Sequence, residues 1–326
     1  MELVLNTFGT SINRDNEGFV IRSKGRVQRV PLNGITAIQI GKGVQITSDA
    51  VMLAIENEID ILFVERTGMP MGRVWSSRYG SISTIRKGQL NFVQTPDALL
   101  WIQQIIAEKI ANQQAMLLLM NADDLTLLRV RERNLNRLED YRTKVMGAKG
   151  AFVPDCAAQL RGWEGMASKI YFSTLNLFIP EQYRFETRSQ HPARDVVNAL
   201  LNYAYGMLYG KLEGLLIKAG IDPYIGVLHR DNYNRPVLVY DVIERYRIWA
   251  DYVVYSLVNQ QVVTDDFCTV QTDGACWLED FGRRVLIQSV NDYLNEVVTI
   301  NNLSRSRITH MMLYTQDLAQ NLKKYI

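Results

Sequence analysis

The first part of the chain, residues 1–94, shows the period-two alternation of apolar and polar side chains that is typical of strands. Residues 35–40 alternate in this way, and the apolar run at 59–64 is typical of a buried strand. Gly25 lies between two further apolar runs and can supply the backbone turn of a hairpin. Residues 50–57 predict a short helix. We therefore predict a small β-sandwich-like domain that contains one helix.

Residues 95–326 change to the three- and four-residue apolar spacing of helices. Thr95 can cap a helix, and Pro96 suits a first helical position, where the missing N–H breaks no hydrogen bond. Apolar positions then recur at Leu99, Ile102, Ile106 and Ile110, and again at Leu125, Leu128, Leu135 and Leu138. Further helical patterns cover 156–178, 194–219, 237–259, 281–298 and 304–324. The predicted fold class is α+β, with a small β-sandwich-like domain (1–94) followed by a larger all-α catalytic domain (95–326).

The composition excludes several classes of protein. Apolar residues make up 47% and charged residues 21%, which excludes a disordered or fibrous chain. The 36 Lys and Arg residues nearly balance 34 Asp and Glu residues, so a protein that binds nucleic acid through bulk positive charge is excluded, although a local basic patch is not. The longest apolar run, residues 115–120, is far shorter than the ~20 residues of a membrane-spanning helix.

The first residues and the cysteines indicate the compartment of the protein. Met1-Glu2-Leu3-Val4 lacks the basic and apolar segments of a secretion signal. The cysteines are odd in number and have no C-x-x-C spacing, which fits a reducing compartment and argues against a disulfide framework or a thiolate zinc site; they are Cys156, Cys268 and Cys276. We expect a soluble, cytoplasmic protein that does not associate with membranes.

Basic residues gather in two segments. Residues 66–96 contain no acidic residue and interleave basic with aromatic side chains, and residues 129–149 carry seven basic residues against three acidic ones. Such patches can neutralise DNA phosphates, and a solvated surface is the open alternative. The candidate DNA contacts in the first segment are Arg66, Arg73, Arg78, Arg86 and Lys87.

The segment that follows His229 carries the first candidate chemistry. Pro236 can open a helix, which would place Asp241 and Glu244 three residues apart on one helical face. Two like charges at the border of an apolar face are unfavourable unless a cation neutralises them. A divalent ion would do so, and a neutral imidazole suits Mn²⁺ better than Ca²⁺. The alternative is a pair of surface carboxylates neutralised by neighbouring arginines.

Glu164 is the candidate third ligand. Gly162 and Gly165 flank it, and each glycine lowers helix propensity by about 1 kcal/mol relative to Ala. Glycines inside a helix usually mark close packing, so we expect Glu164 to point into a crowded site. A buried ion pair is the alternative. The remaining histidines, His191 and His310, are expected to be structural or at the surface.

These segments resemble a known protein family. The matching blocks are Glu164-Gly165-x-Ala167-x-x-x-Tyr171-Phe172, then Arg188-x-x-x-Pro192-x-x-Asp195-x-x-Asn198-Ala199-Leu200-Leu201-Asn202-Tyr203-x-Tyr205, then Gly226-x-Leu228-His229 through Arg235 to Asp241-x-x-Glu244-x-x-Arg247. In this order and spacing they are similar to the CRISPR-associated integrase, the larger of the two universal adaptation proteins, which acquire new spacers. That family also has an N-terminal β domain and a C-terminal helical domain, so the resemblance extends over the whole chain.

The resemblance implies a divalent-metal site, with Mg²⁺ or Mn²⁺ held by Glu164, His229 and Glu244 and with Asp241 as a nearby acidic residue or additional ligand. It implies that a second set supports the site or holds DNA phosphate, namely Arg188, Asn198, Tyr203, Arg235 and Arg247. The implied activity is metal-dependent DNA integration and cleavage, in which 3′-hydroxyl ends of captured DNA are joined to the CRISPR repeat by transesterification. The implied partners are double-stranded DNA, a second copy of the chain and the small second adaptation protein.

Two departures from the family pattern leave every implied ligand in place: Asn234 stands where glycine is common and Arg245 where proline is common. Two other functions remain as alternatives. One is a catalytically silent DNA-binding scaffold of the same fold, which would have little need for Glu164, His229 and Glu244 together. The other is a metal phosphohydrolase that acts on small molecules and does not require long DNA. Within residues 1–94 we expect dimerisation and DNA contacts.

Overall fold

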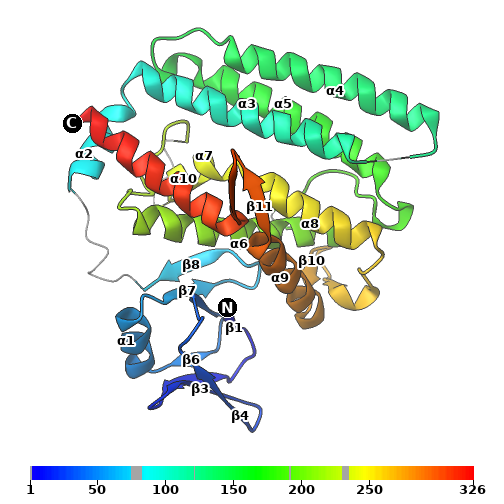
Figure 1. The fold of residues 1–326 in the computed structure, drawn as a ribbon. Coiled ribbons are helices and arrows are strands. Elements are labelled where there is room, and N and C mark those ends of the chain that lie inside the picture. The colour runs from blue at the N-terminus through cyan, green and yellow to red at the C-terminus, as the bar shows by residue number, and fades with distance from the viewer. Residues whose placement is uncertain (1, 75–82, 121, 191, 230–234) are drawn as a thin grey trace. The chain divides into compact units, whose positions relative to one another are not determined.

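The computed structural model describes residues 2–74, 83–120, 122–190, 192–229 and 235–326. The chain forms two compact units, Met1–Gly80 and Ser81–Ile326, which Figure 1 draws as a ribbon. The predicted boundary at residue 94 follows helix α2 (Ser83–Phe92), a helix where the pattern predicts strands. This helix belongs to the second unit because it packs against α10 (Arg307–Leu322) and the chain's last helical turn.

The first unit contains two four-stranded sheets. One has the order β1-β5-β7-β8, in which the first three strands are parallel and the last is antiparallel; its strands are β1 (Glu2–Leu5), β5 (Ala37–Ile40), β7 (Asp60–Val64) and β8 (Pro70–Arg73). The other has the order β4-β3-β2-β6; its strands are β4 (Arg26–Pro31), β3 (Gly18–Ser23), β2 (Ser11–Arg14) and β6 (Gln45–Ile46). Gly25 makes the turn between β3 and β4 at a φ of 76°, as the sequence predicts.

Both sheets and the short helix α1 (Ser48–Glu56) share one apolar core. Ile12 and Phe19 from the second sheet and Ile38 from the first are each 0% exposed and lie in one cluster with Ala50 of α1. The side chain of Thr47 caps α1 by accepting the backbone N–H of Ala50. The prediction of a small, sandwich-like β domain with one helix is therefore confirmed.

The second unit is built from long helices (Figure 1). Helices α3 (Pro96–Leu118), α4 (Leu125–Met146) and α5 (Val153–Leu175) pack on one another, and α6 (Val196–Lys218) packs against α8 (Arg247–Asn259). The sequence of α6 is apolar around most of its circumference, and the helix is therefore buried on all sides for most of its length. Helices α9 (Asp280–Asn295) and α10 are each 16 residues long. In the part of the chain that the structure describes, no helix is both long and apolar enough to span a bilayer.

The helical unit differs from the prediction in two places. The pattern at 237–259 predicts one helix, but the structure has α7 (Val237–Ile243) and α8, with a break between them. Two short hairpins also interrupt the all-α expectation: β9 (Cys268–Val270) with β10 (Cys276–Leu278), and β11 (Val297–Ile300) with β12 (Leu303–Ser306). The second hairpin forms because the β-branched strand 297–300 is followed by Asn301 and Asn302, which adopt the positive φ values of a tight turn.

Candidate functional site

Three of the predicted site residues line one cavity of the helical unit, although they lie on different segments. Glu164 is on α5, Glu244 directly follows α7, and His229 lies in the loop between α6 and α7. The cavity has a volume of about 660 Å³ and continues past Arg247 and Arg188. The fold thus brings together a carboxylate from one segment and an imidazole and a carboxylate from another.

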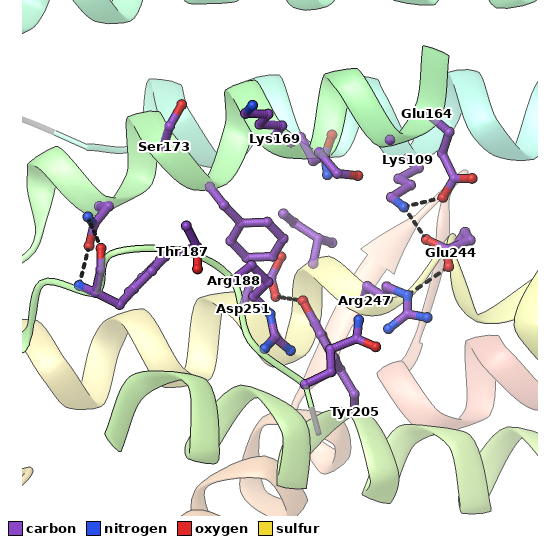
Figure 2. A pocket seen from close by; sticks show the side chains of 18 of the residues that line it. Lys109, Glu164, Lys169, Ser173, Thr187, Arg188, Tyr205, Glu244, Arg247 and Asp251 are labelled. Carbon is purple, nitrogen blue, oxygen red and sulfur yellow. Dashed lines mark hydrogen bonds and ion pairs between the residues drawn. The ribbon is translucent and has the colours of Figure 1, made fainter. Parts of the chain in front are cut away.

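Lys109 of α3 lies between the two carboxylates, as Figure 2 shows. Its Nζ is 2.5 Å from Oε1 of Glu164 and 2.5 Å from Oε2 of Glu244. Arg247 donates from Nε to the other oxygen of Glu244, Oε1, at 2.8 Å. The side chains of Lys109 and Glu244 are only 10% and 7% exposed, so little solvent screens these ion pairs.

The charges in this cluster keep each other ionised. Burial alone would raise the pKa of Glu244, but Arg247 and Lys109 outweigh it and lower that pKa to about 2. Burial likewise disfavours the charged form of Lys109, yet Glu164 and Glu244 raise its pKa. Glu244 is therefore held as an anion by the two cations that contact it, and one of them, Lys109, also contacts Glu164.

Asp241 of α7 fixes the position of His229. Its side chain is fully buried, and its Oδ2 accepts the backbone N–H groups of Val227 at 2.7 Å and Leu228 at 3.1 Å. Its Oδ1 accepts the backbone N–H of His229 at 3.2 Å and lies 2.7 Å from Nδ1 of the imidazole. Since a carboxylate oxygen accepts, Nδ1 carries the proton in the neutral imidazole and Nε2 carries the lone pair. The geometry favours a positioning role for Asp241 over that of an additional ligand.

The environment of His229 also affects its charge. Burial lowers the pKa of the imidazole, but the hydrogen bond and charge of Asp241, together with Glu164 and Glu244, outweigh it and raise the pKa. The ring is partly exposed, at 28% of its side-chain surface, and lines the cavity. His229 is thus held by its buried side and open to the cavity on the other.

A second buried carboxylate, Asp251 of α8, lies further along the cavity. It accepts hydrogen bonds from the hydroxyls of Tyr171, at 3.1 Å, and Tyr205. Burial raises the pKa of Asp251 to about 6, although the two tyrosines and the arginines Arg188 and Arg247 act in the opposite direction. This wall of the cavity therefore combines a buried acid with two guanidinium groups.

The residues expected to support the site have different roles. Arg188 lines the cavity and donates to Oδ1 of Asn198 at 2.8 Å and to Oδ1 of Asn202 at 2.7 Å. Asn198 is 0% exposed and holds the loop that carries Arg188. Tyr203 is buried in α6, and Arg235 is exposed at the start of α7. Arg188 and Asn198 support the cavity directly, whereas Tyr203 packs in the core.

The basic residues of the first unit are not equally available to DNA. Arg66 is exposed in the turn between β7 and β8. Arg73 forms an ion pair with Asp60, and its side chain is only 8% exposed. The geometry therefore assigns Arg73 to the β domain's own structure, whereas Arg66 is at the surface.

The basic residues that follow belong to the second unit. Arg86 on α2 lies 3.9 Å from Asp222, and its side chain is 38% exposed. Lys87 is exposed on the same helix, and Arg78 and His191 fall outside the described residues. His310 contacts the carbonyl of Val298 in the β11–β12 hairpin at 3.1 Å, which is a structural role.

The explanation of the glycines around Glu164 is wrong. Gly162 and Gly165 are exposed, and a Cβ placed on either would meet no atom within 4 Å. They therefore do not mark close packing of another backbone. Glu164 nevertheless lines the cavity. It forms an ion pair with Lys109, which is the alternative that the sequence left open.

Lys109 and Asp251 line the cavity, but the sequence did not predict them as site residues. Lys109 lies on the buried stripe of α3, between Ile106 and Ile110, and Asp251 lies on the buried face of α8 three residues before Val254. A charged residue on an otherwise apolar helical face is the signal that could have identified both.

The donor types around Lys109 are those that suit a divalent cation, but with the lysine between them the described side chains are not spaced as a metal site. Two carboxylates and an imidazole suit Mg²⁺ or Mn²⁺, and the ammonium of Lys109 marks where positive charge is held. Oε2 of Glu244 is buried, and its partner among the described residues is the ammonium of Lys109 at 2.5 Å. Across the described ranges, no three His, Cys, Asp or Glu side chains are gathered closely enough to hold a metal ion. The carboxylates would have to exchange Lys109 for the ion.

Comparisons with known proteins agree on one family. The family model described as "CRISPR associated protein Cas1" matches residues 3–292. The chain is 30% identical over 336 residues to CRISPR-associated endonuclease Cas1 1 of Archaeoglobus fulgidus, covering 99% of this chain and 96% of that protein. It is 27% identical over 260 residues to CRISPR-associated endonuclease Cas1 1 of Francisella tularensis subsp. novicida, covering 79% of each.

Solved structures share the fold. A CAS1 protein from Thermotoga maritima matches with a TM-score of 0.82 at 19% identity, over 99% of this chain and 97% of that one. A casposase bound to integration product also matches with a TM-score of 0.82, at 20% identity, over 99% of this chain and 90% of that one. A chain of the Cas6-RT-Cas1–Cas2 complex matches with a TM-score of 0.82 at 23% identity, where this chain covers 35% of the longer one.

Proposed function

The chain belongs to the Cas1 family of CRISPR-associated proteins, and from this premise we propose that it is a divalent-metal-dependent DNA endonuclease and integrase of CRISPR adaptation. The observation that carries the proposal is the convergence of Glu164, Glu244 and His229 on one cavity that also encloses a cationic group. The two relatives are named as endonucleases, which supports the nuclease part of this proposal.

Glu164, Glu244 and Nε2 of His229 would hold the Mg²⁺ or Mn²⁺ ion. When bound, such an ion acts as a Lewis acid at the scissile phosphate and favours ionisation of the attacking hydroxyl. Asp241 keeps the proton on Nδ1 of His229, so that Nε2 keeps its lone pair. Arg247 neutralises part of the charge on Glu244 through its contact with Oε1.

The reaction exchanges one phosphodiester bond for another. The 3′-hydroxyl of the captured DNA loses its proton and attacks a phosphorus atom of the repeat, and its oxygen forms the new P–O bond. The bond from that phosphorus to the 3′-oxygen of the repeat strand breaks, and this oxygen takes up one proton, so no net proton is consumed. Hydrolysis is the same substitution with water as the attacking group. Arg188 and Arg247 line the cavity and are the cations we assign to the phosphate charge that both reactions concentrate there.

The partners follow from the family. We propose that the protein binds double-stranded DNA, pairs with a second copy of itself and assembles with a small second adaptation protein in the cytoplasm. The Cas6-RT-Cas1–Cas2 complex supports the last assignment, since a chain in it shares this fold. The β-rich first unit is proposed to provide dimer and DNA contacts, and Arg66 is an exposed basic residue of this unit from the candidate set. Lys87, exposed on α2 of the second unit, is a further basic residue available to DNA.

A strand-joining assay tests the proposal. A fluorescent duplex with 3′-hydroxyl ends is incubated with a repeat-containing plasmid, Mn²⁺ or Mg²⁺ and the purified chain, with and without its small partner. We expect joining by the natural chain, loss of joining in Glu164→Ala and His229→Ala, and normal joining in Glu181→Ala, which removes an exposed glutamate of the turn Glu181–Tyr183. Retained joining in both cavity variants would overturn the site assignment, and inactivity of the natural chain would favour the silent scaffold.

A further inference from the structure

The cavity carries its own cation at the place where the proposed function requires an ion. Glu164 and Glu244 bring two negative charges, and Lys109 and Arg247 bring two positive charges, so the four groups sum to zero. Ligand clusters for divalent ions usually keep an excess of negative charge, which binding then neutralises. Here the neutralisation is already complete without a metal.

The two cations are arranged differently around Glu244. Arg247 engages Oε1 through Nε, and Lys109 engages Oε2 and also reaches Glu164 (Figure 2). Lys109 alone therefore bridges the two carboxylates. Its ammonium sits at the end of a flexible four-carbon stem and can move away, whereas the guanidinium of Arg247 is a rigid planar group.

We propose that Lys109 is a positioning residue that holds Glu164 and Glu244 together before the metal binds, and that it competes with the divalent ion for both carboxylates. The inference rests on the proposed function, because it takes these carboxylates as metal ligands. Metal binding exchanges two ion pairs of Lys109 for two metal–oxygen contacts, while the pair between Arg247 and Glu244 persists. Lys109 thus weakens the affinity of the site for the divalent ion. In the metal-free protein it keeps Glu164 and Glu244 in place.

Burial explains why the metal-free chain needs this lysine. Glu244 is 7% exposed at its side chain and Glu164 15%, so water screens their mutual repulsion poorly. Removing Lys109 leaves two neighbouring carboxylates, one buried and one partly buried, with Arg247 in contact with Glu244 of the pair. The metal-free protein should then lose stability, and a divalent ion should restore it.

Manganese binding at one fixed pH tests the inference by a readout that does not depend on activity. Isothermal titration of the full chain with Mn²⁺ is expected to show at least about tenfold tighter binding by Lys109→Met than by the natural chain. The melting temperature of Lys109→Met without metal is expected to be lower, and Mn²⁺ should raise it by more than it raises that of the natural chain. Equal or weaker Mn²⁺ binding by Lys109→Met would overturn the proposal.

Two further variants keep the test decisive. Lys169→Met removes a positive charge that also lines the cavity but lies on the exposed side of α5, and it should leave Mn²⁺ affinity nearly unchanged; tightening as large as in Lys109→Met would contradict a specific competition. Lys109→Gln serves if Lys109→Met does not fold without metal, since its amide can still donate to one carboxylate. The same tightening is expected, and its absence overturns the inference.

The closing control separates this inference from the proposed function. Glu164→Gln is titrated with Mn²⁺ beside the natural chain. If Mn²⁺ binding does not depend on Glu164, the proposed metal site fails. If binding depends on Glu164 but is not tighter in Lys109→Met, the metal site stands and the role of Lys109 fails.

Discussion

Single residues in this protein act through charges that the fold removes from water and then pairs. Asp241 shows this most completely: its two oxygens accept three backbone N–H groups and contact one imidazole nitrogen. A carboxylate with so many donors is fixed in one orientation. Residues 227–229 are fixed with it, because their backbone N–H groups are the donors.

Replacing Asp241 by Asn should therefore weaken the site without removing a proposed ligand. The amide has one acceptor atom instead of two, so part of the loop's hydrogen bonding and the proton on Nδ1 of His229 lose their partner. We expect Mn²⁺ affinity to fall by about 10- to 100-fold, the range found for partners of metal-bound histidines. Titration of Asp241→Asn beside Asp317→Asn, an exposed aspartate of α10, measures it. Unchanged Mn²⁺ affinity in Asp241→Asn would contradict the positioning role.

Asp251 should make the stability of the protein depend on pH. Burial raises the pKa of Asp251 from 3.8 to about 6, so the folded state keeps a proton that the unfolded chain releases. The stabilisation is complete below about pH 4 and is lost as the pH rises through 6, by about 3 kcal/mol in total. Asp251→Asn removes this titration. The free energy of unfolding of the natural chain, relative to Asp251→Asn, should fall between pH 4 and 7; a difference that is constant or rises with pH would refute this.

The site could be predicted from the sequence only in part. The family resemblance implies Glu164, His229 and Glu244 as one set, and they do line one cavity. Lys109 was not predictable as their neighbour, because its contacts arise from the packing of α3 against α5. A single helix shows which face is buried, but not which residue of another helix will meet that face.

At the scale of the elements, the break between α7 and α8 positions the cluster. The apolar pattern at 237–259 is continuous and contains no internal proline or glycine, so it predicts one helix. In the structure the chain tightens after Ile243, where Arg245 and Tyr246 donate to carbonyls three residues earlier, and Arg245 pairs with Glu108 of α3 at 2.8 Å. The break follows from these tertiary contacts, which a local pattern does not contain.

Replacing Gly162 of helix α5 by Ala tests whether this glycine has a packing role. Because Gly162 is exposed and a Cβ there meets no other atom, Gly162→Ala should gain helix propensity without strain. We expect the free energy of unfolding, measured with denaturant, to increase by about 1 kcal/mol and strand joining to be unchanged. A decrease in stability would mean that Gly162 has a packing role that the structure does not show.

At the scale of the whole molecule, the order of a β unit and a larger helical unit was predictable because the apolar period changes from two to about 3.6 along the chain. The position of α2 was not, since its residues include few apolar positions and its burial comes from α10 and the end of the chain. The basic segment 66–96 therefore belongs partly to the β unit and partly to the helical unit, and its basic residues differ in exposure.

DNA binding should reflect that division. Lys87 is exposed, whereas Arg73 is ion-paired with Asp60. Lys87→Ala should weaken DNA binding and reduce the slope of log affinity against log salt by about one. Arg73→Ala should leave the slope unchanged and lower the stability of the protein, because Asp60 loses its partner. Fluorescence anisotropy with a labelled duplex across a salt series measures both slopes; equal changes in the two variants would contradict the assignment.

The most direct measurement of the central claim is diffraction at the manganese absorption edge from crystals of the full chain grown with Mn²⁺. We predict an anomalous peak in contact with a carboxylate oxygen of Glu164, a carboxylate oxygen of Glu244 and Nε2 of His229, with the ammonium of Lys109 displaced from both carboxylates. A cavity without a peak, or manganese bound only elsewhere on the chain, would contradict the account.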